Sequence, residues 1–361
     1  MKQYFKNKTP WFAIVTLALA GCGGGGSDGT SFAAFPVSSA ATPQTQSQPG
    51  SAPANGDSSL ALSVPTPTYA ANSEEIAAFT LLNAERSRCG FGLLAQNVLL
   101  DTAAYGHANY LLKNNETGHF QDPSRPSFTG KEPGDRLLAA GYTWSVVLDD
   151  NTDTRGPGAN NLAGRGQAAI RGLLSAPYHA LSLLAFEHDI GMSILSSDAA
   201  GSTALYGPRA IAQFDIASAL NATAQRPDSA FIQTYPCEGT TGTAYKLTNE
   251  TPNPLPGRNL AVQPVGQPIM IAVRPGRTLT LSSATMAVKA TGAPVALLPA
   301  LTSGRDTTGL IDANQAAIIP ADALAPETEY TVVINGTSSP GSPAGGAGVD
   351  FTKTFSFRTG S

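Results

Sequence analysis

The hydrophobic pattern of this chain changes its period along the sequence, and this change limits the possible folds more than any other feature. From residue 72 to about residue 186, apolar residues recur every three or four positions, as in amphipathic helices. Alternation follows at Ile190, Met192 and Ile194, which is typical of a strand. From about residue 248 the chain consists of short β-like runs separated by Pro and Gly. The pattern predicts an α+β domain followed by an all-β sandwich.

The composition fits two folded parts. The chain has 361 residues, of which 42% are hydrophobic, so a substantial core can form. Only 13% of the residues are charged, and the 37 Gly and 27 Pro residues favour a protein rich in loops or strands. The net charge of −4 is spread without long runs of one sign. The charge pattern therefore gives no indication of a nucleic-acid partner.

The first helix of the α+β part is expected to begin after Asn72, whose side chain is suited to capping, and to end near Cys89. A second helix is expected over about 98–115. His107 lies on the apolar stripe of this helix. We expect it to be a core histidine that is bonded to the backbone.

The N-terminus predicts export. Three lysines precede a short apolar run from Trp11 to Ala20, which is too short to span a bilayer. The run ends in Leu19-Ala20-Gly21-Cys22, which resembles the lipobox of bacterial lipoproteins. The resemblance implies a signal peptide over 1–21, cleavage before Cys22 and acylation of Cys22 as a membrane anchor. Gly23 then favours an outer-membrane or cell-surface location; the alternative is an ordinary secretory signal with an incidental cysteine.

Residues 22–71 are expected to form a lipidated, disordered tether. Ser, Ala, Pro, Gln, Gly and Thr dominate the segment, and it has too few large apolar residues to bury a core of its own. Folded structure is expected from residue 72.

Two cysteines remain if Cys22 is acylated. Cys89 and Cys237 would pair in an oxidising compartment, which predicts one intrachain disulfide. Two free thiols, or one intermolecular bond, are the alternatives.

A short motif marks the last part of the chain: Leu324, Pro326, Thr328 and Tyr330 form a Leu-x-Pro-x-Thr-x-Tyr pattern, and a Phe-x-Phe pair follows at Phe355. This pattern resembles bacterial Ig-like domains of the surface-layer type. The resemblance implies an Ig-like β-sandwich over 248–361, acting as a spacer or an adhesive module.

Four segments follow one another over about 72–220: Asn83-x-x-Arg86, Asn114 to His119, Asp135 to Tyr142, and Ser175-Ala-Pro-Tyr-His179 with Asp189-Ile-Gly-Met192. In this order they resemble the CAP superfamily of cysteine-rich secretory proteins, antigen 5 and pathogenesis-related 1 proteins, in particular bacterial SCP-like members. The resemblance implies a CAP-like domain over 72–238, an α-β-α sandwich with a central cleft.

His119 and His179 would then take the places of the two cleft histidines. The family usually has a Glu-Asn pair after the Gly-Tyr segment, and this chain lacks it there. Asp150 at Asp150-Asn151 offers a shorter acid, and Asn160 is the other candidate. Two histidines with a carboxylate are ligands suited to a divalent metal such as Zn²⁺, or to acid–base work near neutral pH.

Two functions fit this site. The first, which the sequence favours, is a non-enzymatic surface protein that binds a small apolar ligand, such as a lipid or sterol-like molecule, or a protein partner. The second is a metal-assisted or His/Asp-dependent hydrolase of the cell envelope. The sequence has no His-Glu-x-x-His or Gly-x-Ser-x-Gly motif that would mark a familiar hydrolase.

Overall fold

The computed structural model describes residues 58–341 and 346–361. The predicted signal peptide, Cys22 and most of the predicted tether lie outside these residues. Within them, no helix is both long and apolar enough to cross a membrane.

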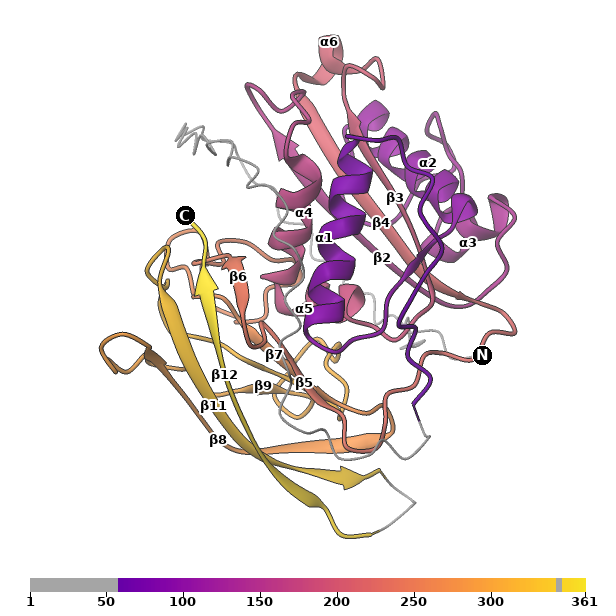
Figure 1. Ribbon diagram of the computed structural model, residues 1–361. Coiled ribbons are helices and arrows are strands. Elements are labelled where there is room, and N and C mark those ends of the chain that lie inside the picture. The colour runs from indigo at the N-terminus through magenta and orange to yellow at the C-terminus, as the bar shows by residue number, and fades with distance from the viewer. Residues whose placement is uncertain (1–57, 342–345) are drawn as a thin grey trace.

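A four-stranded sheet forms the centre of the first part (Figure 1). Its strand order is β1-β3-β4-β2, with β1 parallel to β3 and the other pairs antiparallel. The alternation predicted around Ile190 belongs to β3. The strands are β1 (Ala95–Gln96), β2 (Trp144–Arg155), β3 (Asp189–Ser196) and β4 (Arg209–Ala219).

Helices cover both faces of this sheet, so the predicted α+β class is confirmed and the first part has three layers (Figure 1). One layer contains α1 (Glu74–Arg88), α4 (Arg165–Leu174) and α5 (Pro177–Leu183). The opposite layer contains α2 (Val98–Asn114) and α3 (Pro133–Ala139), and the short α6 (Thr203–Tyr206) lies between β3 and β4.

Alternate residues of β3 face the two helical layers on opposite sides of the sheet. Met192 and Ile194 pack into the same core as α1 and α4. Gly191 points the other way, where a Cβ would lie 2.1 Å from the backbone carbon of Leu100 in α2. Only glycine allows α2 to approach the sheet so closely.

The cap of α1 differs from expectation by one residue. The Ser73 hydroxyl, and not Asn72, caps the helix by accepting from the Ile76 amide at 3.2 Å.

Two further four-stranded sheets face each other in the second part and share one apolar core. The strand orders are β5-β7-β10-β9 and β6-β12-β11-β8. The strands are β5 (Ile232–Tyr235), β6 (Thr240–Thr243), β7 (Ile269–Val273), β8 (Arg277–Val288), β9 (Leu301–Thr302), β10 (Gln315–Ile318), β11 (Glu329–Pro340) and β12 (Val349–Thr359).

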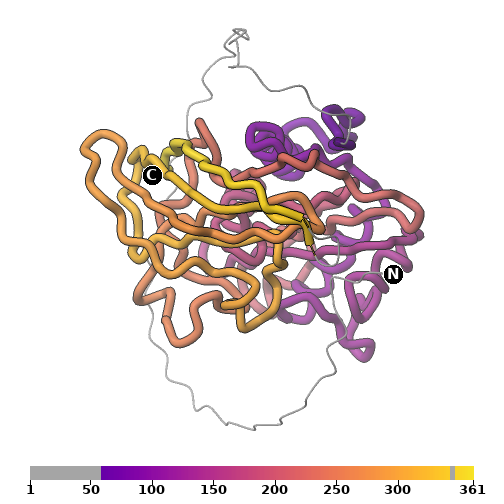
Figure 2. Tube along the Cα trace, turned by 90° about the horizontal axis from the view of Figure 1, so that it is seen from below, coloured from indigo at the N-terminus to yellow at the C-terminus, as the bar shows by residue number. Residues whose placement is uncertain are grey.

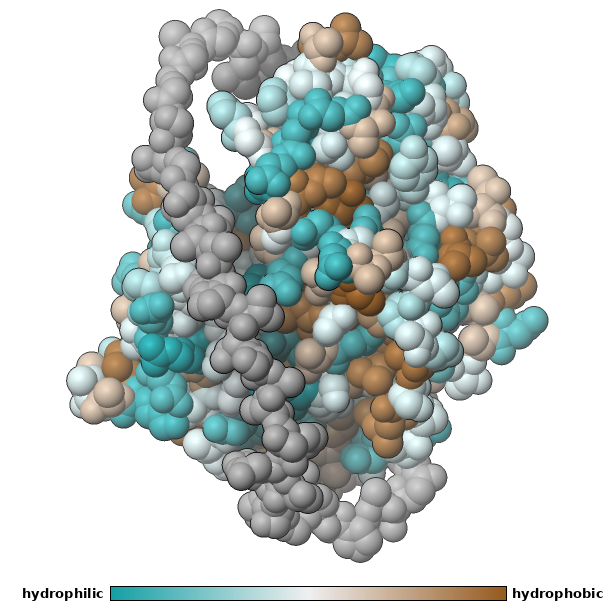
Figure 3. Space-filling model, turned by 45° about the horizontal axis from the view of Figure 1, so that its top comes forward, coloured by the Kyte–Doolittle hydropathy of each residue, from teal (hydrophilic) through white to brown (hydrophobic). Residues whose placement is uncertain are grey.

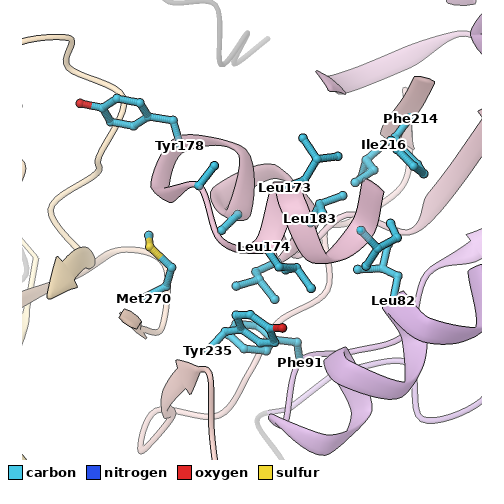
Figure 4. Packing of buried hydrophobic residues seen from close by; sticks show 14 of the residues in the cluster. Leu82, Phe91, Leu173, Leu174, Tyr178, Leu183, Phe214, Ile216, Tyr235 and Met270 are labelled. Carbon is cyan, nitrogen blue, oxygen red and sulfur yellow. The ribbon is translucent and has the colours of Figure 1, made fainter. Parts of the chain in front are cut away.

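The two parts are not separate at the expected boundary between residues 238 and 248. β5 ends before this boundary but pairs with β7, and β6 pairs in parallel with β12. One apolar core also runs through both parts, and its members include Leu174, Met270 and Ala317. Figure 4 shows Met270 in the same cluster of side chains as Leu174 and Tyr178. In Figure 2, which views the molecule from below, the two parts lie side by side.

The predicted disulfide is confirmed. Cys89 and Cys237 are bonded, with their Cα atoms 5.5 Å apart. Cys89 caps the C-terminus of α1, and Cys237 lies between β5 and β6. The bond therefore ties the first helix to the two strands that join the second part.

The described structure begins before residue 72, and residues 58–71 lie against the first part. The Ser59 amide donates to the Arg226 carbonyl at 2.7 Å, and the Tyr69 hydroxyl donates to Asp101 at 2.7 Å. Leu60 and Val64 pack against the shared core. The few apolar residues of this segment suffice because they add to an existing core.

We expect the two parts to unfold together, because they share this core. Met270→Ala should lower the free energy of unfolding by about 2–5 kcal/mol, the usual cost of truncating a buried Met. Denaturation can be measured on a chain that starts at residue 23 and therefore lacks Trp11, so that Trp144 fluorescence reports on the first part. Far-UV circular dichroism provides the second probe. Both midpoints should fall equally.

The control is Val262→Ala, at a side chain that is 73% exposed, which should change the free energy by less than about 0.5 kcal/mol. A Met270→Ala variant whose Trp144 transition stays in place would show that the parts unfold independently.

Candidate functional site

The candidate site lies at β2, one of the two edge strands of the central sheet. β2 pairs only with β4 among the described residues. Asp149 and Asp150 are consecutive residues on it, so their side chains point to opposite faces of the sheet. Each of these carboxylates lies near one of the two predicted histidines, one in each helical layer.

His119 lies on the α3 side, in the loop after α2. Its Nδ1 is hydrogen-bonded to Asp149 Oδ1. The second oxygen of Asp149 accepts from the Arg136 guanidinium, and also from Gln213 Nε2 at 2.8 Å. Arg136 in turn donates to the His119 carbonyl at 2.9 Å. This network fixes both the ring and the backbone of His119.

Nearby charges have a larger effect than burial on the pKa of Asp149. Burial alone raises the pKa of this carboxyl, but the charges of Arg136 and His119 and the hydrogen bond to His119 outweigh it, so the pKa lies below its usual range. Burial also lowers the pKa of His119, and the hydrogen bond and charge of Asp149 reverse the shift, so that pKa is raised.

His179 lies on the other side, in the first turn of α5. Its Nε2 is 3.9 Å from Asp150 Oδ1, and its Nδ1 is 3.3 Å from Glu250 Oε1. Glu250 also accepts from the Tyr178 amide at 2.6 Å. Burial lowers the pKa of His179, but these carboxylates outweigh burial and raise it.

Asp150 lies near His179, and the charges of both histidines act on it. Burial raises its pKa to about 7, although the charges of His179 and His119 act in the opposite direction. Within the described part of the chain, Asp150 Oδ2 and Glu250 Oε2 are buried without a hydrogen-bond partner. His119, His179 and Asp150 can therefore titrate near neutral pH at one strand edge. Such clusters of perturbed groups are common at functional sites.

Asn160, the alternative to Asp150, is in another place. Its amide oxygen accepts from the Ser197 hydroxyl at 2.8 Å and from the Arg209 amide at 3.2 Å. Arg209 pairs with Arg155, which lies five positions beyond Asp150 on β2, about 16 Å along the strand. Asn160 thus holds the far end of the sheet and does not join the histidines.

His107 occupies the core position that we expected. Its ring is fully buried, with Nε2 2.9 Å from the Gly118 carbonyl and Nδ1 3.0 Å from the Gln121 amide nitrogen. Burial lowers the pKa of His107 to about 4. This neutral ring supports the loop that carries His119.

Sequence reasoning missed Asp149 and Glu250. The sequence points to Asp150 and gives no sign of Asp149, although alternation along a strand allows either residue to face a given layer. Glu250 is 71 positions from His179 and lies outside the segment that resembles the family, so no local pattern indicates it.

Metal binding stays a prediction for His119 and His179. Within residues 58–341 and 346–361, no group of three or more His, Cys, Asp or Glu side chains is arranged to hold a metal ion.

A small cavity lies between α4 and the sheet, on the same face of β2 as Asp150. Its volume is about 120 Å³, below the roughly 300–1,000 Å³ of common ligand pockets. Its lining is mainly apolar: Thr152, Thr154, Arg165, Ala168, Ala169, Ile194, Ala210, Ile211 and Ala212.

Comparison with models of protein families and with curated proteins finds no match. Among solved structures, the chain is similar to an extracellular protein containing a SCP domain from Bacillus anthracis str. Ames. The identity is 21%, the match covers 41% of this chain and 41% of that chain, and the TM-score is 0.30. The chain thus matches less than half of that protein's length.

The raised pKa of Asp150 predicts a pH-dependent stability. The folded state holds the proton up to about pH 7, whereas an unfolded Asp loses it near pH 3.9. Stability is therefore lost as the pH rises from about 4 to 7. Asp150→Asn, which stays neutral, should raise the thermal midpoint at pH 8 and change it little at pH 4. Equal changes at both pH values would contradict this assignment.

Proposed function

We propose that this chain is an exported binding protein whose ligand site lies at the edge of β2, between His119 and His179. The supporting observation is that each imidazole has its Nδ1 held by a buried carboxylate. Such pairs orient a ring and leave Nε2 for another contact. The side chains are 32% and 16% exposed, so both rings are accessible to a small molecule.

The chemistry of the site favours a polar ligand over the apolar one that the sequence suggested. Imidazoles and carboxylates surround it, and the unpartnered Asp150 Oδ2 is an acceptor for a ligand N–H or O–H group. The apolar cavity of about 120 Å³ has room for only a few atoms, which disfavours a sterol-like ligand there. On the face shown in Figure 3, apolar residues form several small groups among polar ones.

Hydrolysis is the second candidate, and the pKa of Asp150 favours it. A general base works best when its pKa lies near the operating pH, and that of Asp150 is about 7. In this role Asp150 would accept a proton from the attacking water, and the protonated His179 ring, whose Nε2 is 3.9 Å from Asp150 Oδ1, would donate one to the leaving group.

Export and anchoring form part of the proposal. The Cys89–Cys237 bond is of a kind that persists in oxidising compartments outside the cytosol. With Cys22 acylated, the protein would be held on the outer membrane or cell surface, which places the site among envelope molecules.

Native mass spectrometry of the protein purified from the cell envelope tests the binding proposal. Wild type should carry a co-purifying adduct that the His119→Ala/His179→Ala variant lacks, because both imidazoles contribute contacts. The matched control is His188→Gln, at a ring that bonds the Thr223 carbonyl instead. An adduct retained by the double variant, or none in wild type, would contradict the proposal.

Calorimetry with Zn²⁺ on the same variants tests the metal prediction separately.

A hydrolase would convert the co-purifying molecule into a product of different mass. A conversion rate that rises with pH through about pH 7 would favour hydrolysis over binding.

The anchor predicts the behaviour of one variant. Cys22→Ser should abolish labelling by an alkynyl fatty acid and block the cleavage before residue 22, because it removes the acceptor thiol. Cys89→Ser keeps Cys22 and serves as the control. Unchanged labelling of Cys22→Ser would contradict acylation at this residue.

A further inference from the structure

The connection between β6 and β7 reaches back to the candidate site and contacts α5. Glu250 in this connection is buried, and its Oε1 accepts from the Tyr178 amide at 2.6 Å. The same oxygen is 3.3 Å from Nδ1 of His179. One oxygen from the second part thus contacts both the backbone and the ring at the start of α5.

A second contact holds the same turn. The Tyr178 hydroxyl donates to Asp306 Oδ1 at 2.7 Å. Asp306 is itself fixed, because its other oxygen accepts from the amides of Leu310 and Ile311 at 2.6 and 2.8 Å. The position of His179 therefore depends on two acids that lie outside the three-layered first part.

The geometry determines which nitrogen of His179 carries the proton. Glu250 Oε1 already accepts from an amide, so it acts as an acceptor here. Its Oε2 has no partner among the described residues and can carry a proton without changing that role. A ring nitrogen that faces an acceptor must donate, so Nδ1 carries the hydrogen in the neutral ring. Nε2 lies 3.9 Å from Asp150 Oδ1, beyond hydrogen-bond distance, so it is not held as a donor and has the free lone pair.

We propose that Glu250 is a positioning residue, which fixes His179 as the Nδ1–H tautomer and directs its Nε2 lone pair into the site at β2. The inference rests on the proposed function, because it assumes that Nε2 is the contacting atom. It gives the second part a role in the site itself, beyond that of a spacer or an adhesive module.

Long-range ¹H–¹⁵N NMR of the full exported chain tests this inference. Spectra are recorded at a pH where titration shows all imidazoles neutral, and the His179 signals are assigned from His179→Ala. Wild type should show a protonated Nδ1 on His179. In Glu250→Gln the population of this tautomer should fall about twofold or more, because the neutral amide oxygen that replaces Oε1 is a weaker acceptor than the carboxylate.

Two comparisons make the result specific. His119, held by Asp149, should keep its tautomer in Glu250→Gln. Glu238→Gln is the matched control, because Glu238 also accepts a backbone amide, that of Ser356 at 2.7 Å, without being bonded to a histidine. It should leave His179 unchanged. If Glu250→Gln does not fold, Glu250→Asp takes its place: its shorter side chain moves the acceptor away from Nδ1 and should also lower the population.

A wild-type His179 that is mainly Nε2–H would overturn the inference, whatever the variants do. So would an equal tautomer population in wild type and Glu250→Gln. The readout needs no ligand, so the expected NMR result without a native adduct would remove the proposed function and leave the positioning role.

Discussion

The continuous apolar core is the constraint on which the rest of the structure depends. It joins α1, α4 and α5 to strands of both parts, with Leu174, Met270 and Ala317 in one cluster. Burial of each such side chain contributes about 1.5–3 kcal/mol relative to exposure. Because α5 lies within this cluster, the core places His179 between β2 and the β6–β7 connection. The geometry of the site thus follows from packing across the junction.

A buried ion pair has the corresponding role in the opposite layer. The side chains of Arg136 and Asp149 are 0% and 1% exposed, so their desolvation is costly. Gln213 and His119 supply further hydrogen bonds that offset this cost. Such a network adds little net stability over apolar packing, but it strongly disfavours any arrangement that separates its members. It therefore fixes the orientation of His119.

The sequence predicts what local pattern and short motifs can carry. The α+β class followed from the change in period around residue 190, and the disulfide followed from the count of cysteines. His119, His179 and Asp150 do lie near one strand edge. Glu250 could not be predicted, because a contact over 71 positions leaves no periodic signal. The expected domain boundary near residue 238 does not separate the sheets for a related reason. β5 and β6 are too short for their sequences to indicate which sheet they join.

The position of the site on an edge strand has a consequence for association between chains. An edge strand offers unpaired amides and carbonyls to any extended segment that approaches it. β2 is 12 residues long, and two of its acids, Asp149 and Asp150, are buried close to that edge. Inward-pointing charged side chains are one of the devices by which proteins protect an edge strand from pairing with another chain. The residues that orient the histidines therefore also discourage aggregation through the sheet, and variants that remove these charges should be examined for self-association.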